Sequence, residues 1–115
     1  MKLQIRFLKY FYRRLKPFLK KHPNLKLDLL LALKAFDERR CVCLGGKVYK
    51  MRFKSSDYPR GKSGSFRVIV HFSKVEYILT PVCIYAKSNR ESLAKAEITY
   101  HVGQILLELR HGDTK

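Results

Sequence analysis

Residues 65–86 read SFRVIVHFSKVEYILTPVCIYA, and this stretch sets the architecture that the sequence predicts. Apolar and polar side chains alternate over 65–72, which is typical of a strand with one buried face. The apolar run at 75–86 predicts a second strand, and the short connection between the two favours an antiparallel hairpin. Pro81 cannot donate a ladder hydrogen bond, so we expect an irregularity or a free edge there.

Further elements precede this hairpin. Alternation of apolar and polar residues at 2–7 and again at 47–54 predicts two more strands. Between them, helical spacing of apolar side chains predicts a helix over 8–21, which should kink at Pro17, and a second helix over 25–38. We expect the two helices to form an αα-hairpin with a basic outer surface.

The C-terminal part predicts a last helix over 91–109, introduced by a capping-box pattern of Ser88 and Glu91. The element order is then β-α-α-β-β-β-α. This order predicts an α+β fold in which the N-terminal strand and the αα-hairpin pack on a four-stranded antiparallel sheet, with the helices on one face. We expect a single domain over 1–110 and a polar tail over 111–115.

The charge of the chain is strongly positive. Lys and Arg number 25 against 9 Asp and Glu, for a net charge of +16 over 115 residues. A folded domain this basic usually binds a polyanion: nucleic acid is the first candidate, an anionic membrane surface the second and an acidic protein the third. No uncharged stretch approaches the roughly 20 residues of a membrane helix, and charges interrupt residues 1–21, so we expect neither a membrane span nor a secretion signal.

The chain has three cysteines. Cys41 and Cys43 are too close in sequence for an easy disulfide, because side chains two apart on an extended chain point the same way. We therefore expect free thiols in a reducing, cytoplasmic setting. No second cluster of ligands accompanies this pair, so the sequence predicts no metal site and no cofactor.

Residues 56–67, SDYPRGKSGSFR, contain the Gly-Lys-Ser end of a nucleotide-binding P-loop. Two features exclude that function. Ser56 stands where the first glycine of the motif is required, and the motif leads into a β-branched strand instead of the helix whose amides hold the phosphates.

Cationic side chains gather instead on one face of the two central predicted strands. They alternate with core residues on both strands, and glycines in the connecting loop let a phosphate backbone approach closely. This pattern indicates a surface for an RNA strand more than a pocket for one nucleotide. The residues are Lys50 and Arg52 on one strand, Arg67 and His71 on the next, and Arg60 and Lys62 in the loop.

Three motifs, VYKMRF at 48–53, RGKSGSFRVI at 60–69 and IYAK at 84–87, follow one another in order. With the HPNLK break at 22–26, they give the chain a resemblance to the RelE/ParE toxin superfamily and, within it, to the HigB-like branch, over about residues 2–95. The resemblance implies a RelE-like fold and a type II toxin. Such a toxin is an endoribonuclease, an mRNA interferase that cleaves mRNA at the ribosome without a metal and so inhibits translation.

The resemblance also implies roles for individual residues. Arg67 matches the strand arginine that grips the scissile phosphate. Lys50 and Arg52 match the basic pair of the preceding strand, which acts as base or charge stabiliser. Lys62 is similar to a phosphate-steering residue of the turn, and Lys87 matches the lysine that ends the last strand.

The sequence departs from the RelE pattern at two positions. Ser88 and Ala94 stand where RelE has an arginine and a catalytic tyrosine. His71 and Tyr85 are the best substitutes for the general acid, and Arg90 for the missing arginine. The expected catalytic residues are Arg67, Lys50, Arg52, His71 and Lys87, and the expected RNA-phosphate contacts are Arg60, Lys62, Lys54, Tyr85 and Arg90.

The resemblance implies two partners, mRNA and an acidic antitoxin that covers the basic groove over 50–71; no membrane partner is expected. Two alternative functions stay open. One is a ParE-like toxin that poisons a topoisomerase without nuclease activity, and the other is a non-catalytic basic RNA-binding module. The clustered Lys, Arg and His side chains favour the nuclease over the ParE-like alternative.

Overall fold

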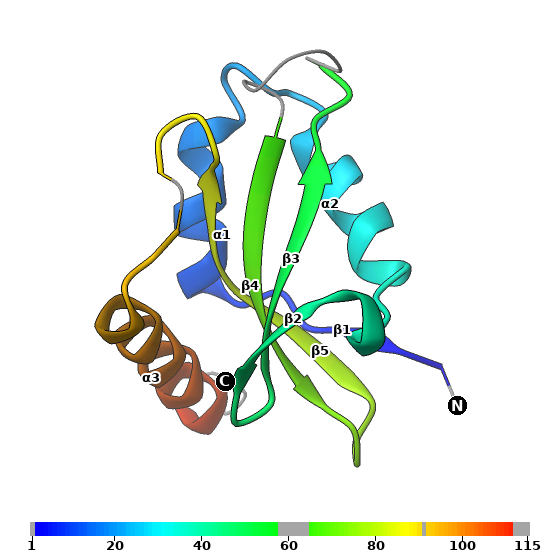
Figure 1. Ribbon diagram of the computed structural model, residues 1–115, viewed down its shortest axis with the longest axis vertical. Helices are drawn as coiled ribbons and strands as arrows, with labels where there is room; N and C mark the ends of the chain where they lie inside the picture. Colours follow the sequence, from blue (N-terminus) through cyan, green and yellow to red (C-terminus); the bar gives the residue numbers. More distant parts are fainter. Residues whose placement is uncertain (1, 58–64, 91, 112–115) are drawn as a thin grey trace.

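The computed structural model describes residues 2–57, 65–90 and 92–111. The strands are β1 (Gln4–Ile5), β2 (Val42–Gly45), β3 (Val48–Lys54), β4 (Ser65–Ser73) and β5 (Ile78–Ala86). The α-helices are α1 (Lys9–Leu15), α2 (Leu25–Lys34) and α3 (Lys95–His111), with short 3₁₀ turns η1 (Lys16–Phe18) and η2 (Glu38–Arg40). The strands form one mixed sheet of order β1-β5-β4-β3-β2 (Figure 1), so the fold is α+β.

β4 and β5 form the antiparallel hairpin that the sequence predicts, in the middle of the sheet. Their ladder shifts register between Ile69, which pairs with Cys83, and Val70, which pairs with Pro81. This shift confirms the irregularity expected at Pro81, because proline has no N–H with which to continue the ladder.

The expectation of a four-stranded antiparallel sheet was wrong in two respects. First, β2 is an additional strand, joined to β3 by a tight turn in which Gly45 and Gly46 have φ of +98° and +54°. All four residues of β2 are exposed. Because neither face of β2 is buried, its sequence carries no alternation from which a strand could be predicted.

Second, β1 pairs with β5 in parallel and keeps only two residues of the strand expected over 2–7. The N–H of Gln4 donates to the carbonyl oxygen of Tyr77, and the N–H of Arg6 donates to that of Leu79, both at 3.0 Å. Alternation in a sequence predicts a strand but specifies neither its neighbour nor its direction, and these depend on the path of the helices that follow.

The two predicted N-terminal helices are present but shorter than expected. α1 ends at Leu15 and gives way to η1, which contains Pro17, so the interruption expected at this proline is confirmed. α2 ends at Lys34, before the predicted boundary at 38. The chain then turns through η2, where the side chain of Asp37 accepts a hydrogen bond from the N–H of Arg39.

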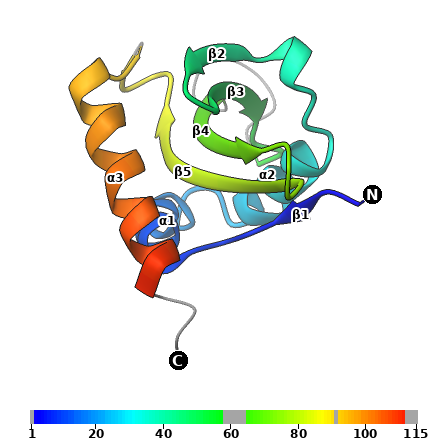
Figure 2. The same cartoon turned by 90° about the horizontal axis from the view of Figure 1, so that it is seen from below.

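Helices cover both faces of the sheet, and the expectation of helices on one face was wrong. One core joins α1 and α2 to alternate residues of β4 that include Phe66, Val68 and Val70. A second core lies on the other face and joins Ile69 of β4 and Val82 of β5 to residues of α3. Figure 2 shows α1 and α2 on the same side of β5, with α3 beside α1. Since β4 is buried on both faces over much of its length, each face needs its own cover.

The last helix begins at Lys95, four residues later than predicted; Glu91 of the expected capping box and the tail residues 112–115 lie outside the described residues. α3 docks against the body of the protein through Ile105, which is fully buried. Near its end, the carboxylate of Glu108 accepts hydrogen bonds from the backbone N–H groups of Lys9 and Tyr10, at 2.7 and 2.9 Å. A carboxylate of α3 therefore satisfies the first amides of α1, which have no partner within their own helix.

Candidate nucleic-acid interface

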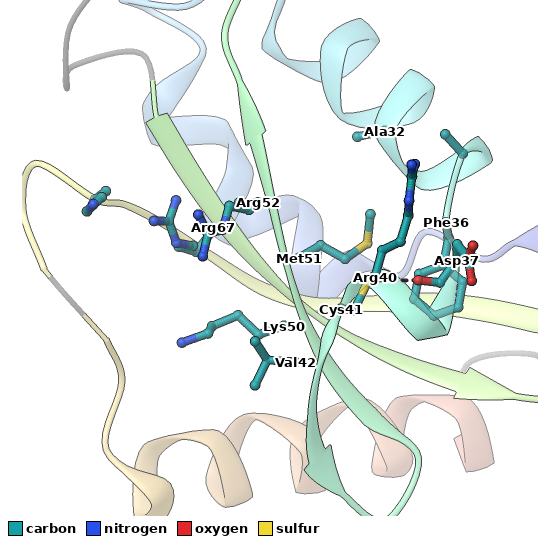
Figure 3. Close-up of a pocket in the computed structure, with 12 residues that line it drawn as sticks. Ala32, Phe36, Asp37, Arg40, Cys41, Val42, Lys50, Met51, Arg52 and Arg67 are labelled. Atoms are coloured by element: carbon teal, nitrogen blue, oxygen red, sulfur yellow. Dashed lines mark hydrogen bonds between the residues drawn. The ribbon is translucent and has the colours of Figure 1, made fainter.

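A row of polar side chains crosses the sheet at the start of β4. Arg52 of β3 pairs with Arg67 of β4, which in turn pairs with Tyr85 of β5. Residues opposite one another in an antiparallel ladder share a face, so the two arginine side chains leave the sheet on the same side from neighbouring positions. Figure 3 shows Lys50 directed to the same side of β3 as these two arginines.

The alternation of β3 and β4 is what places these cations together. Met51, Phe66 and Val68 point into the core on the α1 and α2 side, which forces their neighbours Arg52 and Arg67 to the opposite face. A register slip of one residue would exchange the two sets and bury the cations in that core, so the core fixes the register of the site.

One end of a cavity with a volume of 490 Å³ is lined by four cations, which we call the cationic row: Lys50, Arg52, Arg67 and Lys87. Strand β3 contributes Lys50 and Arg52, and β4 contributes Arg67. Lys87 comes from the turn after β5. The other lining residues come from the end of α2, from η2 and its flanks, and from β2 and β3. They are Ala32, Ala35, Phe36, Asp37, Arg40, Cys41, Val42 and Met51.

The cations of this row have no acidic partner within the described ranges. The ion pairs found there join Arg39 to Asp37, Lys74 to Glu38 and Arg90 to Glu97, and none reaches the row. Arg67 is only 8% exposed, and its side chain donates one long hydrogen bond, of 3.4 Å, to the carbonyl oxygen of Phe66.

An arginine buried to this degree, directly opposite another arginine, is costly unless an anion neutralises it. Phosphate oxygens suit the fork of donors on a guanidinium group, which can contact two of them at once. A phosphodiester bound at this place would supply the negative charge that Arg52 and Arg67 lack among the described residues.

His71 lies apart from this cavity. It pairs with Val48 and Thr80, towards the other end of β4. It stands four positions after Arg67 on the strand, about 13 Å away at the usual rise, and it does not line the cavity. Burial, and then the nearby Lys47, hold the pKa of His71 below its usual value. The structure does not bring His71 together with the cations that the sequence groups it with.

The remaining predicted residues are placed as follows. Tyr85 is buried beside Arg67 in the second core. Arg90 forms two hydrogen bonds of 2.8 Å with Glu97 of α3, which lower the pKa of Glu97 to about 2. Lys54 is exposed at the end of β3, paired with Ser65. Arg60 and Lys62 lie outside the described residues.

Comparison with known proteins gives a likeness of structure but none of sequence. No family model matches the sequence, and no curated protein matches it. Among solved structures, the chain is similar to the E. coli toxin RelE, in a mutant with two arginines replaced by alanine and in the free state. The sequence identity is 17%, the TM-score is 0.47, and the match covers 79% of this chain and 90% of that one. At this level the likeness assigns neither a family nor an activity.

Sequence reasoning missed Arg40, which lines the cavity from η2. The sequence offers no signal for it, because Arg39 and Arg40 are adjacent and equally basic in the pattern. Only the turn of η2 distinguishes them: Arg39 bonds to Asp37, with 3.1 Å between its Nε and Oδ1, and Arg40 lines the cavity.

The described part of the chain has neither a cluster of metal ligands nor a membrane-spanning helix. No group of three His, Cys, Asp or Glu side chains there is placed to hold a metal ion. None of the described helices has the length and apolar character needed to cross a membrane. The three cysteines are free thiols, as expected, and burial raises the pKa of Cys83 to about 12.

Proposed function

We propose that this protein is the toxin of a type II toxin-antitoxin system, a HigB-like member of the RelE/ParE superfamily that cleaves mRNA without a metal. One observation carries the proposal: the row of Lys50, Arg52, Arg67 and Lys87 lines one cavity, and no described carboxylate pairs with any of them. The motifs at 48–53, 60–69 and 84–87 support the same family.

The reaction is an attack of the RNA 2′-hydroxyl oxygen on the adjacent phosphorus. The bond between phosphorus and the 5′-oxygen breaks, which leaves a 2′,3′-cyclic phosphate and a free 5′-hydroxyl. Arg67 and Arg52 bind the non-bridging oxygens and stabilise the extra negative charge of the pentacovalent phosphorane. Lys50 assists removal of the 2′-hydroxyl proton, and Lys87 holds the neighbouring phosphate.

The substrate is mRNA on the ribosome, and the partner that silences the toxin is an acidic antitoxin laid over residues 50–71. The net charge of +16 favours both polyanions. The 5′-oxygen must also receive a proton as it leaves. Because His71 is distant from the cavity, we expect solvent or a group supplied by the ribosome to be the proton donor.

The test is a cell-free translation reaction supplied with the wild type, Arg67→Ala or Arg13→Ala, followed by mapping of mRNA ends. Arg13 is an exposed cation of α1 that does not line the cavity, so its variant controls for loss of one positive charge. We expect cleavage with the wild type and Arg13→Ala, ends that carry a 2′,3′-cyclic phosphate, and intact mRNA with Arg67→Ala. Intact mRNA with all three proteins rules out the nuclease.

A non-catalytic RNA-binding module is the second candidate, and a specific observation favours it. The described lining of the cavity holds no histidine or tyrosine to act as general acid. In this case the wild type binds RNA, Arg67→Ala binds it more weakly, and neither produces new ends.

A further inference from the structure

The cavity is longer than the cationic row. β2 pairs with β3 only from Val48 to Lys50, so the cavity continues around the edge of β3 beyond Lys50. Figure 3 shows Met51 and Phe36 on the opposite side of β3 from the row, with Arg40 beside Ala32. One end of the cavity is therefore cationic, and the other end has mainly apolar walls, with the guanidinium group of Arg40 and the carboxylate of Asp37 also in its lining.

A bound phosphate would explain why one end of the cavity is cationic, but it would not explain the apolar walls of the other end. The walls there include Phe36, Cys41, Met51, Ala32 of α2 and Ala35, which follows the end of that helix. An apolar wall with a small number of convergent polar groups is the usual lining of a site for an organic ligand. In single-stranded RNA the ring next to a bound phosphate is a nucleobase, and unstacked bases commonly insert between apolar or aromatic side chains.

Arg40 is available to such a base. Its backbone N–H donates to the carbonyl oxygen of Asp37 at 2.9 Å, which anchors the residue in the η2 turn. Its side chain forms no hydrogen bond or ion pair with a described residue. The neighbouring Arg39 has the same charge, but its guanidinium group donates to both carboxylate oxygens of Asp37.

We infer that the apolar end of the cavity is a nucleobase subsite in which Arg40 selects guanine. A guanidinium group donates two parallel hydrogen bonds to O6 and N7 of guanine, and no other standard base presents two acceptors on that edge. Arg40 is thus a specificity-determining residue. The inference rests on the proposed RNA substrate and adds the base that the site prefers.

The test measures binding of short 2′-O-methyl oligonucleotides, which lack the attacking hydroxyl and stay intact. One is all uridine, and the others carry a single guanosine, adenosine or abasic position. The proteins are the wild type, Arg40→Lys and Arg39→Lys. Lysine keeps the positive charge but lacks the planar fork, so a phosphate contact survives the substitution whereas guanine recognition does not.

We expect the wild type to bind the guanosine oligonucleotide about 10-fold or more tightly than the others. Arg40→Lys should remove this preference and leave the affinity for the all-uridine strand within about twofold, and Arg39→Lys should preserve both. Thermal unfolding of each variant establishes that it is folded.

Three results overturn the inference while the proposed function stands. The first is RNA binding by the wild type with no preference for guanine, and the second is a preference that survives in Arg40→Lys. The third is a uniform loss of affinity in Arg40→Lys for every oligonucleotide, because that result shows a contact of Arg40 that does not depend on the base. A folded wild type that binds none of the strands overturns the proposed function and this inference with it.

Discussion

The two faces of β4 differ although their residues alternate along one strand. Phe66, Val68, Val70 and Phe72 pack into the core against α1 and α2. On the other face, Ile69 is buried beneath α3, but Arg67 is buried next to Arg52 with no described acidic partner. The first face lowers the free energy of the fold by removing apolar surface from water. The second face keeps a charge in a place where it is costly in the absence of an anion.

This comparison teaches that the fold and the proposed activity are separable on a single strand. Substitutions on the two faces should differ in kind: on one face they change stability, and on the other they change RNA cleavage. Four substitutions test the difference, and they follow from the largest expected effect to the smallest.

Phe66→Ala should cause the largest loss of stability. Phe66 is fully buried and contacts the rings of Phe18, His22 and Phe53 at centroid distances of 5.2, 5.0 and 5.7 Å. Truncation of a buried phenylalanine leaves a cavity and costs about 3–5 kcal/mol. Equilibrium unfolding in urea measures this cost, and a loss below about 1 kcal/mol would contradict the role of this face.

Arg67→Met should give the opposite result on the neighbouring residue. Removal of one charge that stabilises a phosphorane lowers the rate of cleavage by roughly 10²–10³-fold. Stability should hold or increase, because methionine fills a similar volume without a buried charge beside Arg52. Single-turnover cleavage and urea unfolding test the two parts, and unfolding at lower urea than the wild type would show that Arg67 supports the fold.

Glu108→Ala should cause a smaller loss of stability. It weakens the contact of α1 with α3, the helix that covers the second face of β4. The substitution removes the acceptor of the N–H groups of Lys9 and Tyr10, which lie at the start of α1. Loss of a capping acceptor costs about 0.5–2 kcal/mol. Hydrogen exchange should accelerate at these two amides, and Glu108→Gln, which keeps an acceptor oxygen, should lose less. Unchanged exchange in the alanine variant would disprove the contact.

The ion pair of Arg90 and Glu97 should give the smallest effect, visible only as a dependence on pH. Hydrogen bonds from Arg90 lower the pKa of Glu97 from 4.5 to about 2. Because the folded-state pKa lies below the unfolded one, the pair contributes its full stability above pH 4.5 and loses it as the pH falls towards 2. The difference in stability between the wild type and Glu97→Gln should therefore shrink over this window. A constant difference in a pH series of urea unfolding curves would contradict the pair.

The sequence allowed the central hairpin, the break at Pro17 and the face of Arg67 to be predicted, and the structure confirms all three. These features depend on neighbours in the chain: alternation defines the faces of a strand, and proline interrupts a helix or ladder wherever it stands. The prediction that Lys50 and Arg52 share a face with Arg67 had the same local basis.

The local sequence pattern was insufficient for features that depend on contacts between distant segments of the chain. β2 has no buried face to mark it, and nothing at 2–7 shows that β1 runs parallel to β5. His71 shares the face of Arg67 in the sequence, but the position of the cavity depends on other elements, and His71 lies outside it. Arg40 reaches the cavity only because η2 turns towards β3.

The sequence by itself determined the strong positive charge and which residues of β3 and β4 lie on which face, since both follow from composition and a period of two. Tertiary structure alone decided which cations share a cavity, and that α3 covers the second face through Ile105 and Glu108. The physical reason is that a charge acts through the distance and dielectric between it and its neighbours, and folding sets both.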